Sequence, residues 1–285
     1  MTYVTWPYLW PSPVERFSVS FFWAAQFPSY DVFFEGRWVN ADTRPWYYLP
    51  KLISLQLTEP AVILILLGAG LAIFKLRNDK PRRFLFLLLA LWIGVPALGV
   101  MVLDMTVYGN IRHLLFILPA LPAFSAPAFD WLLLHSRKAW LAWAVFALAI
   151  IPGIASLIYL HPYEYIYLNS FTGGVSGGFE RYELDHECIS LREGIEAANR
   201  LVPPGSAVLV PHQGDAALLY ARPDIRFSGN EASSDEADYV LTCSWPAPED
   251  VGKEGSYPVD LSDEGFLPLY MVRRGNAVLA TLWRR

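Results

Sequence analysis

Residues 104–134 read DMTVYGNIRHLLFILPALPAFSAPAFDWLLL, and this stretch decides how the chain is organised. It opens with a polar turn and the pair Arg112 and His113, after which the residues are almost purely apolar. A helix of a soluble protein does not need so long an apolar run, whereas about 20 apolar residues are needed to cross a bilayer. The stretch therefore predicts a membrane span, with Arg112 and His113 at its mouth, where water meets lipid.

Three further apolar segments accompany this span, two before it and one after it. The four predicted spans cover residues 59–76, 84–103, 111–134 and 139–160. The third span carries Pro119, Pro122 and Pro127, so we expect kinks whose freed carbonyls are satisfied by neighbouring helices or water. The sequence thus predicts a bundle of about four transmembrane helices.

The first and the last of the three turns between these spans are basic. The basic residues that flank them are Lys75, Arg77, Lys80, Arg82, Arg83, Arg137 and Lys138. Both turns lie on the same side of four alternating spans, and basic loops remain in the cytoplasm. We therefore expect a multi-pass protein of the cell membrane, with residues 1–57, 104–110 and 161–285 on the extracytoplasmic side.

The composition fits a mixed protein rather than a bare group of spans. Of 285 residues, 54% are hydrophobic and 17% are charged, and the mean hydropathy is +0.30. These values are too apolar for an ordinary soluble enzyme and too polar for spans alone. Residues 161–285 hold 19 of the 27 acidic residues, and so acidic a region argues against a nucleic-acid partner.

After Pro162 the pattern changes to short strands and helices. Residues 190–202 predict a helix in which Ser190 and Glu193 have the spacing of a capping box. Further elements are predicted at residues 207–211 (strand), 215–221 (helix), 225–228 (strand), 238–243 (strand) and 270–283 (hairpin). The hairpin turns at Arg274-Gly275-Asn276. This succession predicts a small α/β domain.

The predicted fold is therefore an α-helical membrane bundle (residues 58–160) followed by a small extracytoplasmic α/β domain (residues 161–285). An aromatic extracytoplasmic or interfacial region (residues 1–57) precedes both. Within it, residues 14–26 predict a short helix whose aromatic side suits the membrane interface, and the rest reads as irregular. No signal-peptide pattern opens this external region, so we expect the chain to be the C-terminal part of a longer membrane protein.

The first candidate site is the mouth of the third span, with Arg112, His113 and Tyr108. A guanidinium offers forked donors for phosphate oxygens, and ionisable groups at membrane depth are functional candidates. The pattern indicates the edge of a site for an anionic, lipid-linked substrate. The alternative is an interfacial arginine that extends to the membrane surface and pairs with Asp104 or a lipid headgroup.

The second candidate site is the external stretch FEGRWVNADTRPWYY at residues 34–48. Charges alternate there with aromatic rings, which stack on sugar faces while arginines hold phosphate. The residues expected to contact sugar or phosphate are Glu35, Arg37, Arg44, Trp46 and Tyr47. The alternative is an aromatic belt at the level of the lipid headgroups, with solvated charges.

The remaining groups carry weaker signals. Residues 183–187 (ELDHE) combine carboxylates with His186, but no second His or Cys stands at a helical spacing. A solvated or locally bonded loop is therefore favoured over a metal site. No cofactor is predicted, and a divalent cation is not supported. Cys188 and Cys243 are too few for a disulfide scaffold, and buried free thiols are favoured over a pair.

Several motifs in order along residues 1–200 resemble the C-terminal half of bacterial glycosyltransferase family 39. They are WPYLWPSPVERF, FFEGRWVNADTRPWYYLP, YGNIRHLLFILPALPAF, HPYEYIYLNSFTGG and YELDHECISLREGIEAAN. This family comprises polytopic GT-C enzymes related to protein O-mannosyltransferases. The resemblance implies transfer of a mannose-like sugar on the outer face of the membrane. The implied partners are a polyprenyl-phosphate-linked sugar, membrane lipids and an acceptor.

The resemblance also implies roles for particular residues. Arg112 matches the family's arginine before the Pro-containing span, which is implicated in lipid-phosphate binding. The loop from Glu35 to Tyr48 matches the external loop that borders the substrate cavity. The family's catalytic carboxylate lies in its first external loop and has no counterpart in this chain, so no catalytic residue is assigned and Asp104 does not take that role. Cys188-Ile189 departs from the family, whose members often carry an aromatic residue and a glycine there.

Two functions from different classes follow from these patterns. The first is the C-terminal portion of a membrane glycosyltransferase. The second is a non-catalytic, membrane-anchored protein whose acidic external α/β domain binds a partner. A transporter is disfavoured, because the spans contain almost no charge apart from Asp130.

Overall fold

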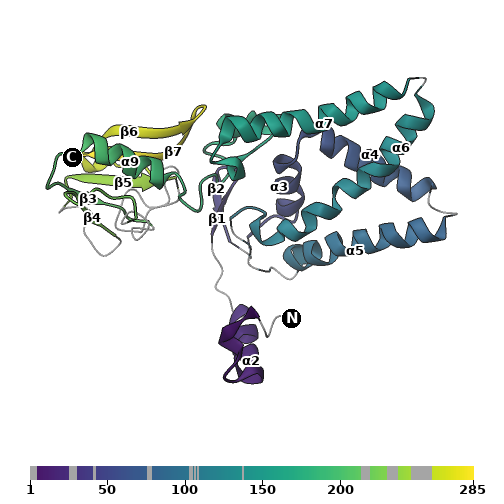
Figure 1. Ribbon diagram of the computed structural model, residues 1–285, viewed down its shortest axis with the longest axis horizontal. Coiled ribbons are helices and arrows are strands. Elements are labelled where there is room, and N and C mark those ends of the chain that lie inside the picture. The colour runs from purple at the N-terminus through teal and green to yellow at the C-terminus, as the bar shows by residue number, and fades with distance from the viewer. Residues whose placement is uncertain are drawn as a thin grey trace.

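The computed structural model describes residues 5–25, 31–40, 43–75, 79–102, 105, 107, 109–136, 138–212, 219–229, 237–244 and 259–285. It shows a group of long helices with a mixed β-sheet domain at one end of them (Figure 1). A short connecting region joins the two parts, and α2 (Pro13–Ala25) lies apart from both in Figure 1.

Four apolar segments form the group of long helices. They are α4 (Glu59–Lys75), α5 (Lys80–Val102), the third segment with η3 (Arg112–Ala120), η4 (Pro122–Ser125) and α6 (Ala126–His135), and α7 (Ala139–Leu160). Among the described residues, α5, the third segment and α7 are long and apolar enough to cross a membrane, and α4 is a shorter apolar helix. The four predicted spans are thus found in place, and three of them reach spanning length within the described residues.

The prolines shape the third segment. It begins as a 3-10 helix at Arg112 and becomes an α-helix only from Ala126. Proline has no N–H and interrupts the regular ladder of helical hydrogen bonds, which accounts for the tighter turns around Pro119 and Pro122. In α4, the Cα of Gly68 lies so close to the backbone of Phe124 that a side chain has no room there.

Most apolar side chains of the long helices face outward. In α5, only 6% of the most apolar 18-residue stretch is buried, and the same share is buried in the corresponding stretch of α7. Leu148 is 62% exposed and Ile158 is 77% exposed. So large an apolar surface marks contact with a partner or with lipid. Together with the lengths of the helices, it indicates a membrane protein.

The basic turns and the sheet lie at opposite ends of the long helices. The C-terminal ends of α4 and α6 and the N-terminal ends of α5 and α7 all lie at the end away from the sheet (Figure 1). The described Lys and Arg residues at that end are Lys75, Lys80, Arg82, Arg83 and Lys138. The charge pattern therefore distinguishes the two ends of the bundle.

The region before the long helices is more regular than the sequence predicts. After η1 (Pro7–Leu9) and α2, strands β1 (Val32–Phe34) and β2 (Arg37–Val39) form an antiparallel hairpin, and α3 (Tyr48–Gln56) follows. The hairpin turns at Glu35 and Gly36, whose φ angles are 55° and 78°. Strands of three residues are too short to show a period of two, so the sequence does not reveal them.

The segment after α7 holds the parts together. It contains η5 (Glu164–Ile166), η6 (Ser170–Thr172) and α8 (Gly174–Gly178). The buried side chain of Asn169 donates to the carbonyls of Ser54 at 2.7 Å and Leu57 at 2.8 Å. These bonds satisfy carbonyls at the C-terminal end of α3, which a helix end otherwise leaves without partners.

The C-terminal domain is a five-stranded sheet of order β4-β3-β5-β7-β6 with one helix, α9 (Leu191–Leu201). The strands are β3 (Ala207–Leu209), β4 (Arg226–Ser228), β5 (Tyr239–Cys243), β6 (Leu267–Arg274) and β7 (Ala277–Arg284). β3 is parallel to β4 and β5, and β7 is antiparallel to β5 and β6. Ile195 of α9 packs in one core with Leu241 and Leu282. A second core includes Phe266, which follows η8 (Ser262–Glu264).

The predicted α9 helix, the three single strands and the hairpin are all found within a few residues of their predicted places. The predicted helix at 215–221 lies mostly outside the described residues. The predicted capping box is wrong, because the side chain of Ser190 makes no capping bond. Instead, Asp185 accepts from the N–H groups of Ile189 at 3.0 Å and Ser190 at 3.2 Å.

The preference for free thiols is also wrong. Cys188 and Cys243 form a disulfide, with their Cα atoms 5.4 Å apart. The bond links the loop before α9 to β5. The two cysteines are 55 residues apart in the sequence. Spacing alone does not predict such a pairing, because it depends on how the strands are arranged.

The tip of the β6–β7 hairpin fixes the sheet domain on the long helices. Arg274 donates to the carbonyl of His161 at 3.3 Å, and its guanidinium lies 4.4 Å from the centre of the Tyr163 ring. Tyr163 donates to Glu193 of α9 at 2.9 Å. The end of α7 and the start of α9 are therefore held in one arrangement, and a cavity lies at this junction.

Candidate functional site

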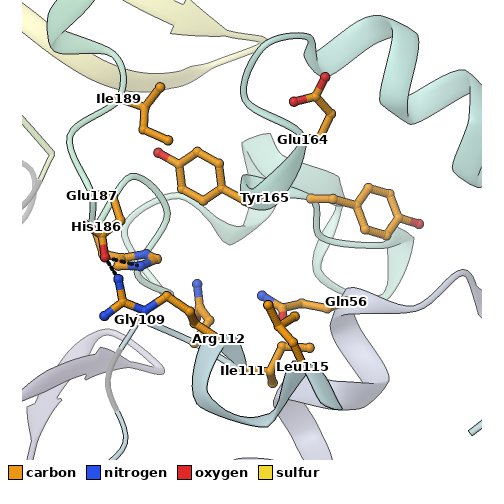
Figure 2. A pocket seen from close by; sticks show the side chains of 12 residues that line it. Gln56, Gly109, Ile111, Arg112, Leu115, Glu164, Tyr165, His186, Glu187 and Ile189 are labelled. Atoms are coloured by element: carbon orange, nitrogen blue, oxygen red, sulfur yellow. Dashed lines mark ion pairs between the residues drawn. The ribbon is translucent and has the colours of Figure 1, made fainter. Parts of the chain in front are cut away.

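A cavity of about 420 Å³ lies where the long helices meet the sheet domain. Its walls come from the C-terminal end of α3, the turn into η3, the segment after α7 and the loop before α9. The lining residues are Gln56, Gly109, Asn110, Ile111, Arg112, Leu115, Glu164, Tyr165, Tyr167, His186, Glu187 and Ile189 (Figure 2). This volume lies within the usual range for small-molecule sites.

Arg112 and Glu187 form an ion pair on one wall of the cavity (Figure 2). Their side chains are 38% and 37% exposed, so both are accessible from the cavity. Arg112 follows a turn in which Gly109 and Asn110 have φ angles of 66° and 57°. The side-chain amide of Asn110 donates to the carbonyl of Glu183 at 2.9 Å, which fixes this turn to the loop that carries Glu187.

His186 lies beside this ion pair, with its Nε2 3.4 Å from Oε1 of Glu187. A Cβ atom on Gly109 would lie only 2.5 Å from Nε2 of His186, so the contact requires glycine at 109. Burial, with a smaller contribution from the charge of Arg112, lowers the pKa of His186 to about 4. His186 is therefore neutral at neutral pH, and Arg112 carries the positive charge of this wall.

Two buried carboxyl groups support the loop before α9. Glu183 is 2% exposed and Asp185 is 1% exposed. Burial raises the pKa of Glu183 to about 8, against the opposing effect of Arg112, and raises that of Asp185 to about 7. Asp185 also accepts from the hydroxyls of Tyr165 and Ser190. Oε1 of Glu183 has no hydrogen-bond partner within the described residues.

Gln56 supplies an amide group to the cavity. It lies on the side away from His186 and Glu187 (Figure 2). Its Oε1 is buried and has no hydrogen-bond partner in the described part of the chain. Because this oxygen has no exposed surface, Gln56 forms part of the wall without offering that oxygen to a molecule in the cavity. The cavity therefore offers a paired guanidinium at one side, and Tyr165 and Tyr167 contribute aromatic rings to its lining.

The structure places Arg112, from the first predicted cluster, in the wall of this cavity. His113 is exposed and is not among the lining residues. Tyr108 lies outside the described residues. The third predicted group, residues 183–187, was expected to be a solvated or locally bonded loop. It is buried in large part, and its Glu187 joins Arg112.

The second predicted cluster lies away from the cavity lining. None of its five members lines the cavity: Glu35, Arg37, Arg44, Trp46 and Tyr47. Glu35 pairs with Lys51 and accepts from the hydroxyl of Tyr47 at 3.0 Å. The hydrogen bond from Lys51 lowers the pKa of Glu35. Arg44 donates to the carbonyls of Met105 at 2.8 Å and Val107 at 3.4 Å, so it supports the turn that leads to Arg112.

Sequence reasoning missed Gln56, Tyr165 and the partnership of Glu187 with Arg112. A sequence signal existed for Glu187, which stands in the acidic run 183–187, but nothing local indicates that it meets a residue 75 positions earlier. Gln56 is a single amide in an apolar stretch and carries no signal of its own. Within the described residues, no group of three or more His, Cys, Asp or Glu side chains is arranged to hold a metal ion.

No protein-family model, curated protein or solved structure matches this chain. Membership of the glycosyltransferase family that the motifs resemble therefore stays a prediction. The chemistry of the cavity and its place at the end of the apolar helices are the observations from which a function is proposed.

Proposed function

We propose that this chain is part of a membrane glycosyltransferase that uses a polyprenyl-phosphate-linked sugar on the outer face of the membrane. In this proposal the cavity at the bundle–sheet junction binds the phosphate and the sugar of the donor. The single observation that carries it is the position of Arg112. This residue begins an apolar segment of spanning length and also lines a cavity outside that segment.

A lipid-linked donor fits this position for a physical reason. Its prenyl chain belongs in the bilayer beside the apolar helices, and its phosphate belongs at the membrane surface, where the helices end. A guanidinium at that level offers two parallel donors to phosphate oxygens. The sugar would then lie in the cavity, beside the tyrosine side chains of its lining.

Two features support an extracytoplasmic location of the cavity. The basic turns lie at the opposite end of the long helices (Figure 1), and basic turns stay in the cytoplasm. The sheet domain next to the cavity contains the Cys188–Cys243 disulfide, and disulfides persist mainly outside the cytoplasm. Both features favour a cavity that opens toward the outer face.

The proposed reaction is a displacement at the anomeric carbon of the sugar. An acceptor oxygen forms a bond to this carbon, the bond from the carbon to the phosphate oxygen breaks, and its electron pair stays on the phosphate. The acceptor's proton passes to a carboxylate base, which the resembled family carries outside the motifs matched here. Arg112 would stabilise the negative charge that develops on the departing phosphate.

The test compares Arg112→Ala with Arg192→Ala in membranes that contain the complete enzyme, in which the proposed carboxylate base is present. Arg192 is a matched control because it pairs with Glu196 at 3.2 Å on α9 and does not line the cavity. We expect Arg112→Ala to lower the transfer of labelled mannose from polyprenyl-phosphate-mannose by about 100-fold or more, and Arg192→Ala to leave it unchanged.

Two results would contradict the proposal. Equal transfer by the Arg112→Ala variant and the unchanged protein would remove Arg112 from the donor site. Equal incorporation by membranes with and without the complete, full-length protein would favour the second function, a non-catalytic membrane-anchored protein whose external α/β domain binds a partner.

A further inference from the structure

We propose that Glu187 is a built-in competitor for the donor's phosphate, which weakens the binding of the donor slightly and the binding of the lipid-phosphate product strongly. This inference rests on the proposed function and assigns to Glu187 a role in product release. Its basis is the Arg112–Glu187 ion pair in the wall of the cavity.

The geometry makes Arg112 a guanidinium that already holds an anion. A carboxylate and a phosphate use the same forked donors, so both cannot take the same face of the guanidinium at once. The pair is more than a third exposed on each side, and pairs with such exposure contribute little to stability. Exchange of the Glu187 carboxylate for a phosphate therefore has a small cost.

The surroundings keep Glu187 close to Arg112 when the pair separates. Glu187 lies between Asp185, which is held by two backbone N–H groups, and Cys188, which is bonded to β5. Asn110 ties the turn before Arg112 to the same loop. Both partners are thus fixed through their backbones, and only their side chains need to move. The carboxylate stays within reach of the guanidinium and can return to it.

The charge of the lipid phosphate changes during transfer, and this gives the competitor its effect. The donor is a phosphodiester with one negative charge. Loss of the sugar turns it into a phosphomonoester, which carries about −1.5 to −2 charges at neutral pH. An arginine without a competitor would therefore hold the product more tightly than the donor. The return of Glu187 to Arg112 opposes this and favours release.

The consequence is a separation of KM from kcat. Removal of the charge in Glu187→Gln leaves Arg112 more available for phosphate, so we expect the KM for polyprenyl-phosphate-mannose to fall about three- to tenfold. The inhibition constant of free polyprenyl phosphate should fall by a larger factor, because the displaced Glu187 carboxylate stays close to the phosphate and repels the more highly charged molecule more strongly. The kcat should decrease, since product leaves more slowly.

The experiment measures inhibition of mannose transfer by polyprenyl phosphate in membranes that contain the complete enzyme or one of its variants. Glu187→Asp keeps the charge on a shorter side chain and should give intermediate values, which tests the role without removing the carboxylate. Glu196→Gln is the matched control, since it breaks the exposed Arg192–Glu196 pair outside the cavity and should change nothing.

The outcomes separate this inference from the function on which it rests. If the unchanged protein is inhibited and Arg112→Ala is not, but Glu187→Gln behaves like Glu196→Gln, the competitor role is wrong and the donor site stands. If neither the unchanged protein nor any variant responds to polyprenyl phosphate, the proposed function itself fails. If phosphatidic acid inhibits as strongly as polyprenyl phosphate, the site binds lipid headgroups in general, and the competitor role for the product is overturned.

Discussion

Helices α7 and α9 both have apolar faces that must be kept from water, but they achieve this in opposite ways. Large apolar side chains of α7 such as Leu148 and Ile158 are 62% and 77% exposed. In α9, Ile195 is 1% exposed and packs with Leu241 in the core of the sheet domain. The apolar face of α9 therefore needs protein around it, whereas that of α7 needs lipid.

This difference explains why the cavity lies where it does. The outward faces of the long helices are mostly apolar. At the junction, Arg112 adjoins both the apolar helices and a polar loop. A site for a molecule with a lipid tail and a charged head requires both surroundings.

The largest expected effect concerns the covalent link of the sheet domain. Replacement of both Cys188 and Cys243 by serine opens a loop of 55 residues, and for such a loop the chain-entropy relation gives a loss of about 4 kcal/mol. The sheet domain depends on this link, and the long helices do not. Hydrogen exchange followed by mass spectrometry should therefore show lost protection in α9 and β5 and unchanged protection in α7.

Reduction of the unchanged protein is the natural control, because it opens the same bond without any substitution. It should reproduce the loss of protection in α9 and β5. Equal loss in α7 would mean that the two parts unfold together, and the distinction between them would then be wrong.

The next effect tests which solvent surrounds α7. Leu148→Asp places a charge near the middle of this helix, and a carboxylate there disfavours membrane insertion by about 3 kcal/mol. Leu267→Asp is the matched control, because Leu267 is 63% exposed at the start of β6. Its replacement should change stability by less than about 0.5 kcal/mol. A membrane-insertion assay with glycosylation tags measures the first, and equal insertion of the variant would contradict the membrane assignment of α7.

The comparison also shows why parts of the fold were predictable from sequence. The ends of α7 are where the sequence predicts them, because hydropathy is a local property and lipid imposes it along the whole helix. The hairpin β6–β7 follows from its turn at Gly275. The strands β1 and β2 were missed, because three residues are too few for a pattern.

The site was only half predictable for a related reason. Arg112 stands out because an arginine opens an apolar stretch. Its partner Glu187 is chosen by tertiary structure, as is the role of Asp185 in place of Ser190 at the start of α9. The Cys188–Cys243 bond likewise depends on β5 lying beside that loop. Contacts between distant parts of the chain have no local sequence signal, and these are the contacts that build the cavity.

A third effect concerns the buried carboxyl behind the cavity wall, and it depends on pH. Burial raises the pKa of Glu183 to about 8 from its ordinary value of 4.5. The folded protein therefore binds a proton at Glu183 that the unfolded chain has lost between these two values. Between pH 4.5 and about pH 8, the contribution of Glu183 to the free energy of unfolding therefore decreases as pH rises. Below about pH 4.5 this contribution is fully retained.

Glu183→Gln imitates the protonated carboxyl and removes this dependence. The variant should match the unchanged protein near pH 4 and exceed it by at least about 2 kcal/mol at pH 9. His186 and Asp185 titrate in both proteins, so their contributions cancel in the difference. Chemical unfolding of the two proteins at several pH values measures the effect, and a difference that is constant with pH would show that Glu183 is ionised in the folded state.

The smallest effect concerns Gly109, in the turn before Arg112. A comparison with Gly205, in the loop between α9 and β3, separates the cost of the backbone conformation from the cost of the contact with His186. Gly109 and Gly205 both have positive φ angles, 66° and 85°. A Cβ at Gly205 meets nothing within 4 Å, whereas a Cβ at Gly109 lies 2.5 Å from His186. Gly205→Ala should therefore cost only the backbone term of about 1 kcal/mol, and Gly109→Ala should cost up to about 1 kcal/mol more. The additional cost arises because His186 must move away from the turn and from Glu187.

If the proposed function holds, this movement of His186 also changes the KM for the donor in Gly109→Ala, whereas Gly205→Ala leaves that KM unchanged. Equal unfolding free energies and equal KM values for the two variants would show that the Gly109–His186 contact does not position Arg112 and Glu187.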